Sequence, residues 1–213
     1  MSRTRAVIFD FNGTLSHDEP VLLAIYQELF AEHGRPLTAD DYFSRLAGNT
    51  EEAIISGWLG VEGAELEALV AERISRYRAT ADGSTVPAAI REAVRYAAAR
   101  GPVAIVSGAF RTEIEPVLAA AELTELFTAV VTADDVVNGK PAPDGYLLAL
   151  SLLGALPPAE VVAFEDTEAG VASAKAAGLR CVAVLGTLPA VRLAEADEIV
   201  ERIDVALLER LLA

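Results

Sequence analysis

The stretch Val7-Ile8-Phe9-Asp10-Phe11-Asn12-Gly13-Thr14-Leu15 decides how the rest of the chain is interpreted. Three apolar, strand-favouring residues run into a carboxylate and then a Gly-Thr pair, which indicates a short buried strand with an abrupt end. Asp10 then lies at the carboxyl end of that strand, where open α/β sheets bind their ligands. Gly13 has no Cβ and lets the backbone turn or approach a ligand closely. Taken alone, an Asp here is most simply a turn residue, so its partners along the chain decide its role.

Further apolar runs alternate with helical patterns through the second half of the chain. Strands are expected at 103–106, 129–131, 161–164 and 181–184, with 199–200 as a final edge strand. Helices are expected at 87–100, 111–121, 144–153, 167–177 and 205–212. Alternation of this kind predicts parallel strands with helices on both faces, which is a doubly wound α/β sheet.

Residues 16–85 have a different character, because they show helical periodicity without an intervening strand. Apolar residues recur at helical spacing from Val21 to Phe30, and capping signals at Thr38 and Thr50 begin further helices. We therefore expect an α-helical cap domain over residues 16–85, inserted into a core domain formed by residues 1–15 and 86–213.

Composition limits the classes of partner. The 213 residues carry a formal net charge of -15, which disfavours nucleic acid and anionic membranes as partners. An anionic substrate then needs a local positive site, most simply a metal ion and a lysine. The chain has two lysines, Lys140 and Lys175. The second lies in an Ala-rich helical pattern and is expected on a solvated face.

The sequence also favours a protein of the cytoplasm. A single cysteine, Cys181, excludes an internal disulfide and fits a reducing compartment. The basic residues near Met1 precede a short strand and not the apolar region of a signal peptide, and no apolar run is long enough to span a bilayer. The sequence does not indicate the oligomeric state.

Polar residues suited to phosphate or metal follow the predicted core strands. They are Asp10, the pair Ser107-Gly108, Lys140 in a rigid loop before Pro141, and the pair Glu165-Asp166. Because the carboxyl ends of parallel strands meet at one edge, these groups can converge. The three carboxylates form the oxygen-rich setting that Mg²⁺ prefers.

This set of groups predicts a phosphoryl-transfer site. With Mg²⁺ and Lys140 present, the site is locally positive, and Ser107, with the Gly108 N–H at a helix start, can hydrogen-bond a phosphate oxygen. Asp10 can then attack phosphorus and form an aspartyl-phosphate that water resolves.

The motifs in order resemble the haloacid dehalogenase superfamily, in particular its β-phosphoglucomutase-like and phosphoglycolate-phosphatase-like branch with a small helical cap. The resemblance covers nearly the whole chain and rests on four segments: 10–15, 105–108, 139–144 and 164–170. It implies a Rossmann-like core and Mg²⁺-dependent hydrolysis of a small phosphorylated metabolite through the nucleophile Asp10. It also implies phosphoryl binding by Ser107 and Lys140, with Thr14 and Gly108 expected beside them. Mg²⁺ would be placed by Asp10, the carbonyl of Asn12, Asp166 and Glu165.

Asn12 departs from this pattern, because family phosphatases usually carry a second Asp there that acts as acid and base. An amide can hydrogen-bond a leaving oxygen but cannot deliver a proton. Three explanations stay open. The substrate has a good leaving group, a neighbour such as His17 or Glu19 supplies the proton, or the chain is a catalytically impaired phosphate-binding or regulatory member.

Other activities of the resembling family are disfavoured. A phosphohexomutase needs a cationic cap group, and Glu51 stands where such members carry arginine; Arg45 is the nearest cation. A phosphonate hydrolase needs a cap lysine, and no lysine precedes Lys140. The metal-suited pair Glu165-Asp166 argues against a 2-haloacid dehalogenase, and the glycine fingerprint of dinucleotide-binding folds is missing after the first strand.

Overall fold

The computed structural model describes residues 4–213 and contains one six-stranded parallel sheet of order β3-β2-β1-β4-β5-β6. Its strands are β1 (Ala6–Phe9), β2 (Val103–Val106), β3 (Ala129–Val131), β4 (Val161–Glu165), β5 (Arg180–Val184) and β6 (Glu198–Val200). The first strand is central, paired with β2 on one side and β4 on the other. The doubly wound parallel sheet predicted from the sequence is confirmed.

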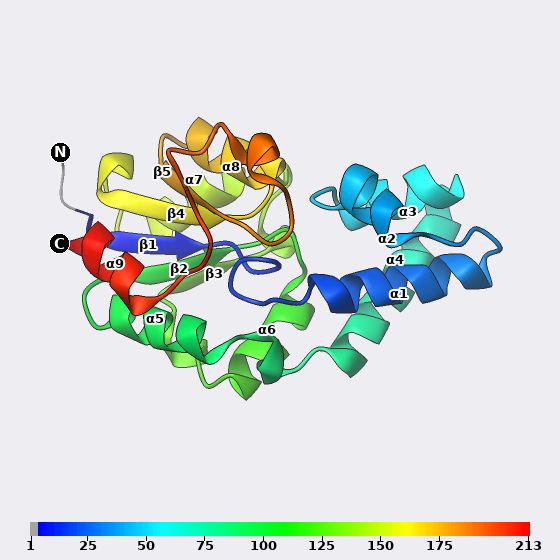
Figure 1. Ribbon diagram of the computed structural model, residues 1–213, viewed down its shortest axis with the longest axis horizontal. Helices are drawn as coiled ribbons and strands as arrows, with labels where there is room; N and C mark the ends of the chain where they lie inside the picture. Colours follow the sequence, from blue (N-terminus) through cyan, green and yellow to red (C-terminus); the bar gives the residue numbers. More distant parts are fainter. Residues whose placement is uncertain (1–3) are drawn as a thin grey trace.

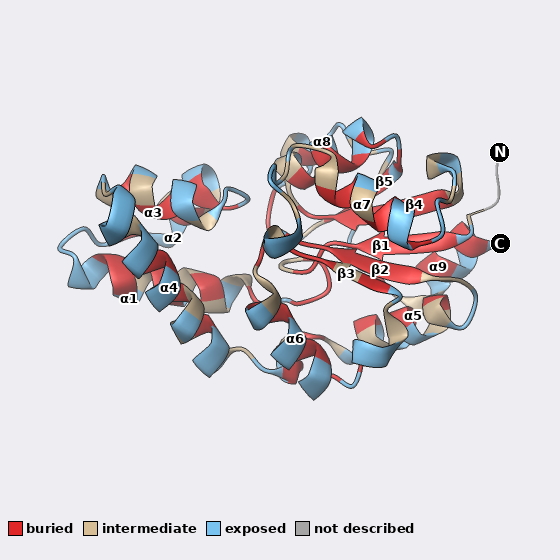
Figure 2. Ribbon diagram, turned by 180° about the vertical axis from the view of Figure 1, so that it is seen from behind, coloured by how far each residue is buried: buried red, intermediate tan, exposed pale blue. Residues whose placement is uncertain are grey.

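Helices cover both faces of the sheet (Figure 1). One face carries α5 (Ala88–Ala98), α6 (Arg111–Ala120) and α9 (Val205–Leu212), and the other carries α7 (Asp144–Leu152) and α8 (Glu168–Ala176). Successive side chains of β1 therefore enter two different cores: Val7 and Phe9 join the first, and Ala6 and Ile8 the second. Burial on both faces explains why the inner strands β1, β2 and β4 read as apolar runs, and Figure 2 shows these three strands buried.

Four further helices form a lobe beyond the carboxyl ends of the strands (Figure 1). They are α1 (Glu19–Glu32), α2 (Ala39–Asp41), α3 (Glu51–Leu59) and α4 (Gly63–Thr80), with a π-helical turn at Tyr42–Leu46. Thr38 and Thr50 cap α2 and α3, because each hydroxyl accepts a hydrogen bond from a backbone N–H three residues later. We call α1 to α4 the helical lobe.

The chain enters and leaves the helical lobe through two segments that are bonded to each other. The backbone N–H of His17 donates to the carbonyl of Thr85 at 2.7 Å, and the Ser16 hydroxyl donates to that of Thr85 at 2.7 Å. The division into core and cap domains at residues 16 and 85 stays a prediction. The part of the chain that the structure describes also contains five short 3₁₀ turns: Gly83–Thr85, Thr124–Leu126, Ala133–Asp135, Pro158–Glu160 and Ala190–Leu193.

No helix within residues 4–213 has both the length and the apolar character needed to cross a bilayer.

Candidate active site

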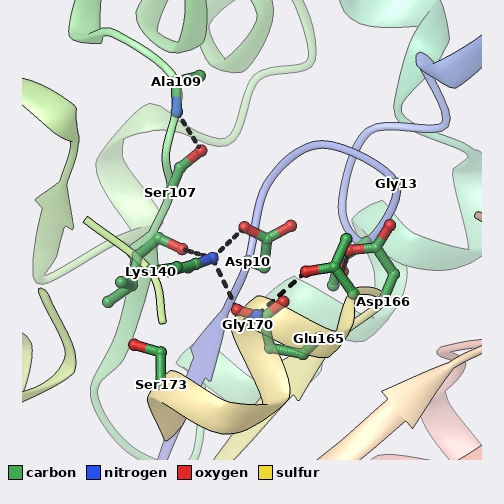
Figure 3. Close-up of polar contacts among 12 residues, drawn as sticks. Asp10, Gly13, Ser107, Ala109, Lys140, Glu165, Asp166, Gly170 and Ser173 are labelled. Atoms are coloured by element: carbon green, nitrogen blue, oxygen red, sulfur yellow. Dashed lines mark hydrogen bonds and ion pairs between the residues drawn. The ribbon is translucent and has the colours of Figure 1, made fainter. Parts of the chain in front are cut away.

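The groups that the sequence placed at strand ends lie together at one edge of the sheet (Figure 3). Asp10 follows β1, Ser107 follows β2, and Glu165 is the last residue of β4. Lys140 comes from the loop between β3 and α7. The parallel register aligns the strands that carry them, with Phe9 opposite both Ile105 and Phe164.

Lys140 is the centre of the polar contacts. Its ammonium lies 2.5 Å from Oδ1 of Asp10, 2.6 Å from Oε1 of Glu165 and 2.9 Å from the carbonyl of Val106. Burial favours a neutral amine, but the two carboxylates outweigh it and raise the pKa of Lys140 above its ordinary value. The side chain is therefore a cation fixed beside Asp10.

Glu165 is fixed from three sides. Its Oε1 atom contacts Lys140 and accepts a 2.6 Å hydrogen bond from the hydroxyl of Tyr146. Its Oε2 atom lies against Gly170, where a Cβ would come within 1.8 Å. Burial raises the pKa of Glu165 to about 7, against the opposing effect of Lys140. Only glycine at position 170 lets helix α8 pass this close to the carboxylate.

Asp166, like Glu165, is a buried carboxylate with one unpartnered oxygen. Thr14 donates to its Oδ1 at 3.3 Å, whereas its Oδ2 is buried without a hydrogen-bond partner. Gly13 has a left-handed backbone (φ 73°), and a Cβ there would lie 1.9 Å from that same Oδ2. Burial, followed by the charges of Asp10 and Glu165, raises the pKa of Asp166 well above its ordinary value. The unpartnered oxygen and the raised pKa of Asp166 indicate a position where a bound cation would be stabilising.

The three carboxylates fit a hard metal ion. One oxygen each from Asp10, Glu165 and Asp166 lies within 4.8 Å of the others. An oxygen-only donor set suits Mg²⁺, and the unpartnered Oδ2 of Asp166 is an available ligand atom. Oε1 of Glu165 is held by Lys140 and Tyr146, and Oδ1 of Asp10 is held by Lys140. Oε2 of Glu165 is also buried without a hydrogen-bond partner, so Glu165 and Asp166 each offer one free oxygen.

Ser107 and Gly108 lie in the loop between β2 and α6. The Ser107 hydroxyl accepts a 3.1 Å hydrogen bond from the N–H of Ala109, which leaves its own proton free to be donated. The sequence analysis placed the Gly108 N–H at a helix start, but α6 begins only at Arg111. Gly108 is instead an exposed loop residue that lines the cavity described below.

Thr14 lies elsewhere than the sequence suggested. It is fully buried and donates to Asp166, and it does not appear among the described residues that line the cavity. Thr14 therefore supports the Asp166 carboxylate from outside the cavity.

Asn12 lines the cavity, and its side-chain amide is hydrogen-bonded to Asp18. Its amide nitrogen donates to Oδ2 of Asp18 at 2.8 Å. Asp18 is fully buried and also accepts hydrogen bonds from the Gly13 N–H, at 3.3 Å, and from the Tyr77 hydroxyl. Of the two neighbours suggested as proton donors, Glu19 lines the cavity, and His17 is exposed and lies outside the lining.

A cavity of about 330 Å³ lies between this edge of the sheet and the helical lobe. The core contributes Asp10, Asn12, Ser107, Gly108, Lys140 and Asp166, and the lobe contributes Glu19, Tyr26, Tyr42, Glu51, Glu52 and Arg73. The sequence analysis missed Arg73, Asp18 and Tyr146. Arg45, the cation it did consider, is largely exposed and pairs with Asp41.

Comparison with known proteins agrees with this site. The model of the haloacid dehalogenase-like hydrolase family matches residues 4–178. Validoxylamine A 7'-phosphate phosphatase of Streptomyces hygroscopicus subsp. limoneus is 33% identical, over 91% of each chain. Fructose-1-phosphate phosphatase of Escherichia coli (strain K12) is 31% identical, over 85% of this chain and 97% of its own. The crystal structure of CbbY from Rhodobacter sphaeroides in complex with phosphate superposes with a TM-score of 0.82 at 25% identity, covering 94% of this chain and 95% of that one.

The chain therefore belongs to the haloacid dehalogenase-like hydrolases. It is a phosphoric monoester hydrolase, as its relatives named as phosphatases support.

Proposed function

We propose that the chain hydrolyses a small phosphorylated metabolite, of the sugar phosphate type, through an aspartyl-phosphate on Asp10, with Mg²⁺ as cofactor. The observation that carries the proposal is the contact of Lys140 with Asp10 beside the free oxygen of Asp166. The names of two relatives, which act on validoxylamine A 7'-phosphate and on fructose 1-phosphate, support the substrate type.

In the first step, a carboxylate oxygen of Asp10 attacks phosphorus and the bond from phosphorus to the leaving oxygen breaks. Lys140 and the Ser107 hydroxyl hold the phosphoryl oxygens by charge and hydrogen bonding. In the second step, water attacks the aspartyl-phosphate, which releases inorganic phosphate and regenerates the Asp10 carboxylate. The leaving oxygen takes its proton from water or from a group other than Asn12, because an amide has no acidic proton to give.

Asp10 and Asp166, with the backbone carbonyl of Asn12 and with Glu165 behind them, would hold Mg²⁺. When bound, the ion neutralises the crowded carboxylates and offsets the charge of the phosphoryl group. This role explains why three buried carboxylates are found in a chain of strongly negative net charge.

The helical lobe would act as the cap that covers the substrate. It supplies about a third of the residues that line the cavity, so the leaving group contacts residues of the lobe while the phosphoryl group contacts the strand ends. We propose residues 16–85 as this cap domain.

Asn12 favours a second candidate function, in which the chain binds a phosphorylated ligand and turns it over poorly. General acid–base assistance is worth roughly 10²–10⁴-fold in rate. Without it, phosphate esters with poor leaving groups react slowly, whereas activated substrates do not need it.

The test is the Mg²⁺-dependent turnover of p-nitrophenyl phosphate by wild type and Asp10→Asn. We expect Asp10→Asn to lose at least 10³-fold in kcat, while Asp40→Asn on the exposed part of α2 stays at the wild-type value. Turnover that survives in Asp10→Asn would overturn the mechanism. If the wild-type chain hydrolyses p-nitrophenyl phosphate but not a sugar phosphate, the second function is favoured.

A further inference from the structure

The side of the cavity formed by the helical lobe is acidic, and the one cation among its described lining residues is already paired with carboxylates. Arg73 of α4 is 2% exposed. Its guanidinium pairs with Glu51 of α3 at 3.2 Å and with Glu113 of α6, and it lies over the rings of Tyr26 and Tyr77. Two carboxylates for one guanidinium leave no positive charge for a ligand.

Glu19 and Glu52 are the carboxylates of this side of the cavity that form no ion pair with any described residue, and Glu19 is the one oriented by a hydrogen bond. It lines the cavity together with Asp10 and Asn12. The Tyr42 hydroxyl donates a 3.0 Å hydrogen bond to its Oε2, which orients the carboxylate and leaves Oε1 for a ligand. Glu52 adds a further acidic side chain to the lining.

The acidic side of the cavity, formed by Glu19, Glu51 and Glu52, belongs to a lobe that lies close to the strand ends carrying Asp10 and Asp166. A Cβ on Gly48, in the turn before α3, would be 3.1 Å from the methyl group of Thr167, the residue after Asp166. Arg192 of the core also donates to the carbonyl of Phe43 in the lobe at 3.5 Å. A leaving group attached to a phosphoryl group at Asp10 therefore extends toward Glu19 and Glu51.

This charge arrangement selects among leaving groups. A second phosphate or a carboxylate would face like charges in a partly buried cavity, where screening by solvent is weak. Hydroxyl groups can donate hydrogen bonds to the carboxylates, and an ammonium group can form a charge-assisted hydrogen bond with Glu19.

We propose that the substrate is a phosphate monoester whose leaving group carries hydroxyls and a protonated amine and no second anion, with Glu19 as the residue that binds the amine. The inference rests on the proposed phosphatase function. Burial, followed by the charges of Asp18 and Asp10, raises the pKa of Glu19 to about 7, so a ligand cation would relieve a real electrostatic cost there.

Three six-carbon phosphate esters test the proposal: glucosamine 6-phosphate with an amine, glucose 6-phosphate with hydroxyls alone, and 6-phosphogluconate, an open-chain acid with a carboxylate. We expect kcat/KM to be at least threefold higher for the amine than for glucose 6-phosphate, and at least tenfold lower for 6-phosphogluconate. In Glu19→Gln, kcat/KM for glucosamine 6-phosphate should lie within twofold of kcat/KM for glucose 6-phosphate.

Glu67→Gln is the matched control, because it removes the same charge from an exposed position of α4 outside the cavity. It should keep all three wild-type ratios. The proposal is overturned if 6-phosphogluconate is hydrolysed as well as glucose 6-phosphate, or if Glu19→Gln keeps the wild-type preference for the amine.

Failure of the phosphatase function would show as no turnover of p-nitrophenyl phosphate or of any of the three esters. The charge selection is then decided by calorimetric binding of the same three esters to the Mg²⁺-loaded chain. The same order of affinities would support it, and equal or reversed affinities would overturn it.

Discussion

The side-chain amide of Asn12 is anchored by the buried carboxylate of Asp18 through a 2.8 Å hydrogen bond. This bond uses one of the two amide protons and fixes the orientation of the group at the cavity. Asn12 therefore has one N–H and its carbonyl oxygen for a leaving group or a water molecule. It can orient a reactant, but it cannot exchange a proton with one.

Asn12→Asp should increase the turnover of sugar phosphates. A carboxyl group placed beside Asp18 and Asp10 is surrounded by like charges, which favours its protonated form and makes it a general acid. We expect kcat for glucose 6-phosphate to rise by about 10²-fold or more, up to the ~10⁴-fold that acid–base catalysis supplies. Turnover of p-nitrophenyl phosphate should change far less, because p-nitrophenolate leaves without protonation. Equal effects on both substrates would show that another group already supplies the proton.

Mg²⁺ should stabilise the folded chain through Asp166. A ligand that binds only the native state raises Tm in proportion to the logarithm of its concentration above Kd. We expect Tm in 10 mM Mg²⁺ to exceed Tm in EDTA for wild type and for the surface control Asp40→Asn. Asp166→Asn should lose this shift, and it should be at least as stable as wild type in EDTA because a buried, repelled charge is gone. An undiminished shift in Asp166→Asn would place the ion elsewhere.

Gly170→Ala should displace the side chain of Glu165, because the added methyl group overlaps its carboxylate. The added methyl would lie 1.8 Å from Oε2 of that carboxylate, so the side chain must leave its contacts with Lys140 and Tyr146. Overpacking of this kind costs about 1–3 kcal/mol, and we expect at least a tenfold loss of kcat.

The matched control for Gly170→Ala is Gly57→Ala in α3, where a Cβ meets no atom within 4 Å. That variant should gain about 0.5–1 kcal/mol, as alanine does in an open helix position. Urea denaturation and p-nitrophenyl phosphate turnover measure both variants. A neutral effect at both positions would mean that Glu165 is not held in place by the close approach of α8.

Glu19→Gln should change how stability depends on pH. The pKa of Glu19 is raised from 4.5 to about 7 in the folded state by burial first and by Asp18 and Asp10 next. Between these two values the folded state binds more protons than the unfolded state, so this carboxyl lowers stability as pH rises from 4.5 to 7.

The Gln variant lacks this titration. It should therefore be more stable than wild type at pH 8, by up to about 3 kcal/mol. The advantage should vanish near pH 4.5. Urea denaturation at pH 5, 6.5 and 8 in EDTA measures the difference, and Glu67→Gln serves as control. A difference between Glu19→Gln and wild type that does not vary with pH would contradict the assigned pKa.

The parallel sheet and the strand-end groups were predictable from the sequence because both depend on local patterns. Apolar runs buried on two faces give uninterrupted strand signals, and the residue after each run marks the same sheet edge. Asp10, Lys140 and Asp166 were found in this way, and the structure brings them together.

The residues of the helical lobe that line the cavity were not predictable in the same way. Arg73 is spaced four residues from both Leu69 and Tyr77, on the buried face of α4. A charged residue on an apolar helix face was the available signal. Its partner Glu113 is 40 residues away, in α6 on the face of the sheet, so no local pattern joins the two. Asp18 was missed because its role comes from Tyr77, which reaches it across 59 residues.

The bonded pair of segments at His17 and Thr85 has a consequence for how such a chain can diversify. The stretch between those two residues joins the core covalently through this one bonded junction, and its further contacts with the core are made by side chains such as Arg73 with Glu113. Helices can be exchanged on the far side of the junction without altering the register of β1 or the position of Asp10. The chemistry of the strand ends and the choice of leaving group are thus inherited separately, and a new specificity can be acquired by replacing a single contiguous stretch of the chain.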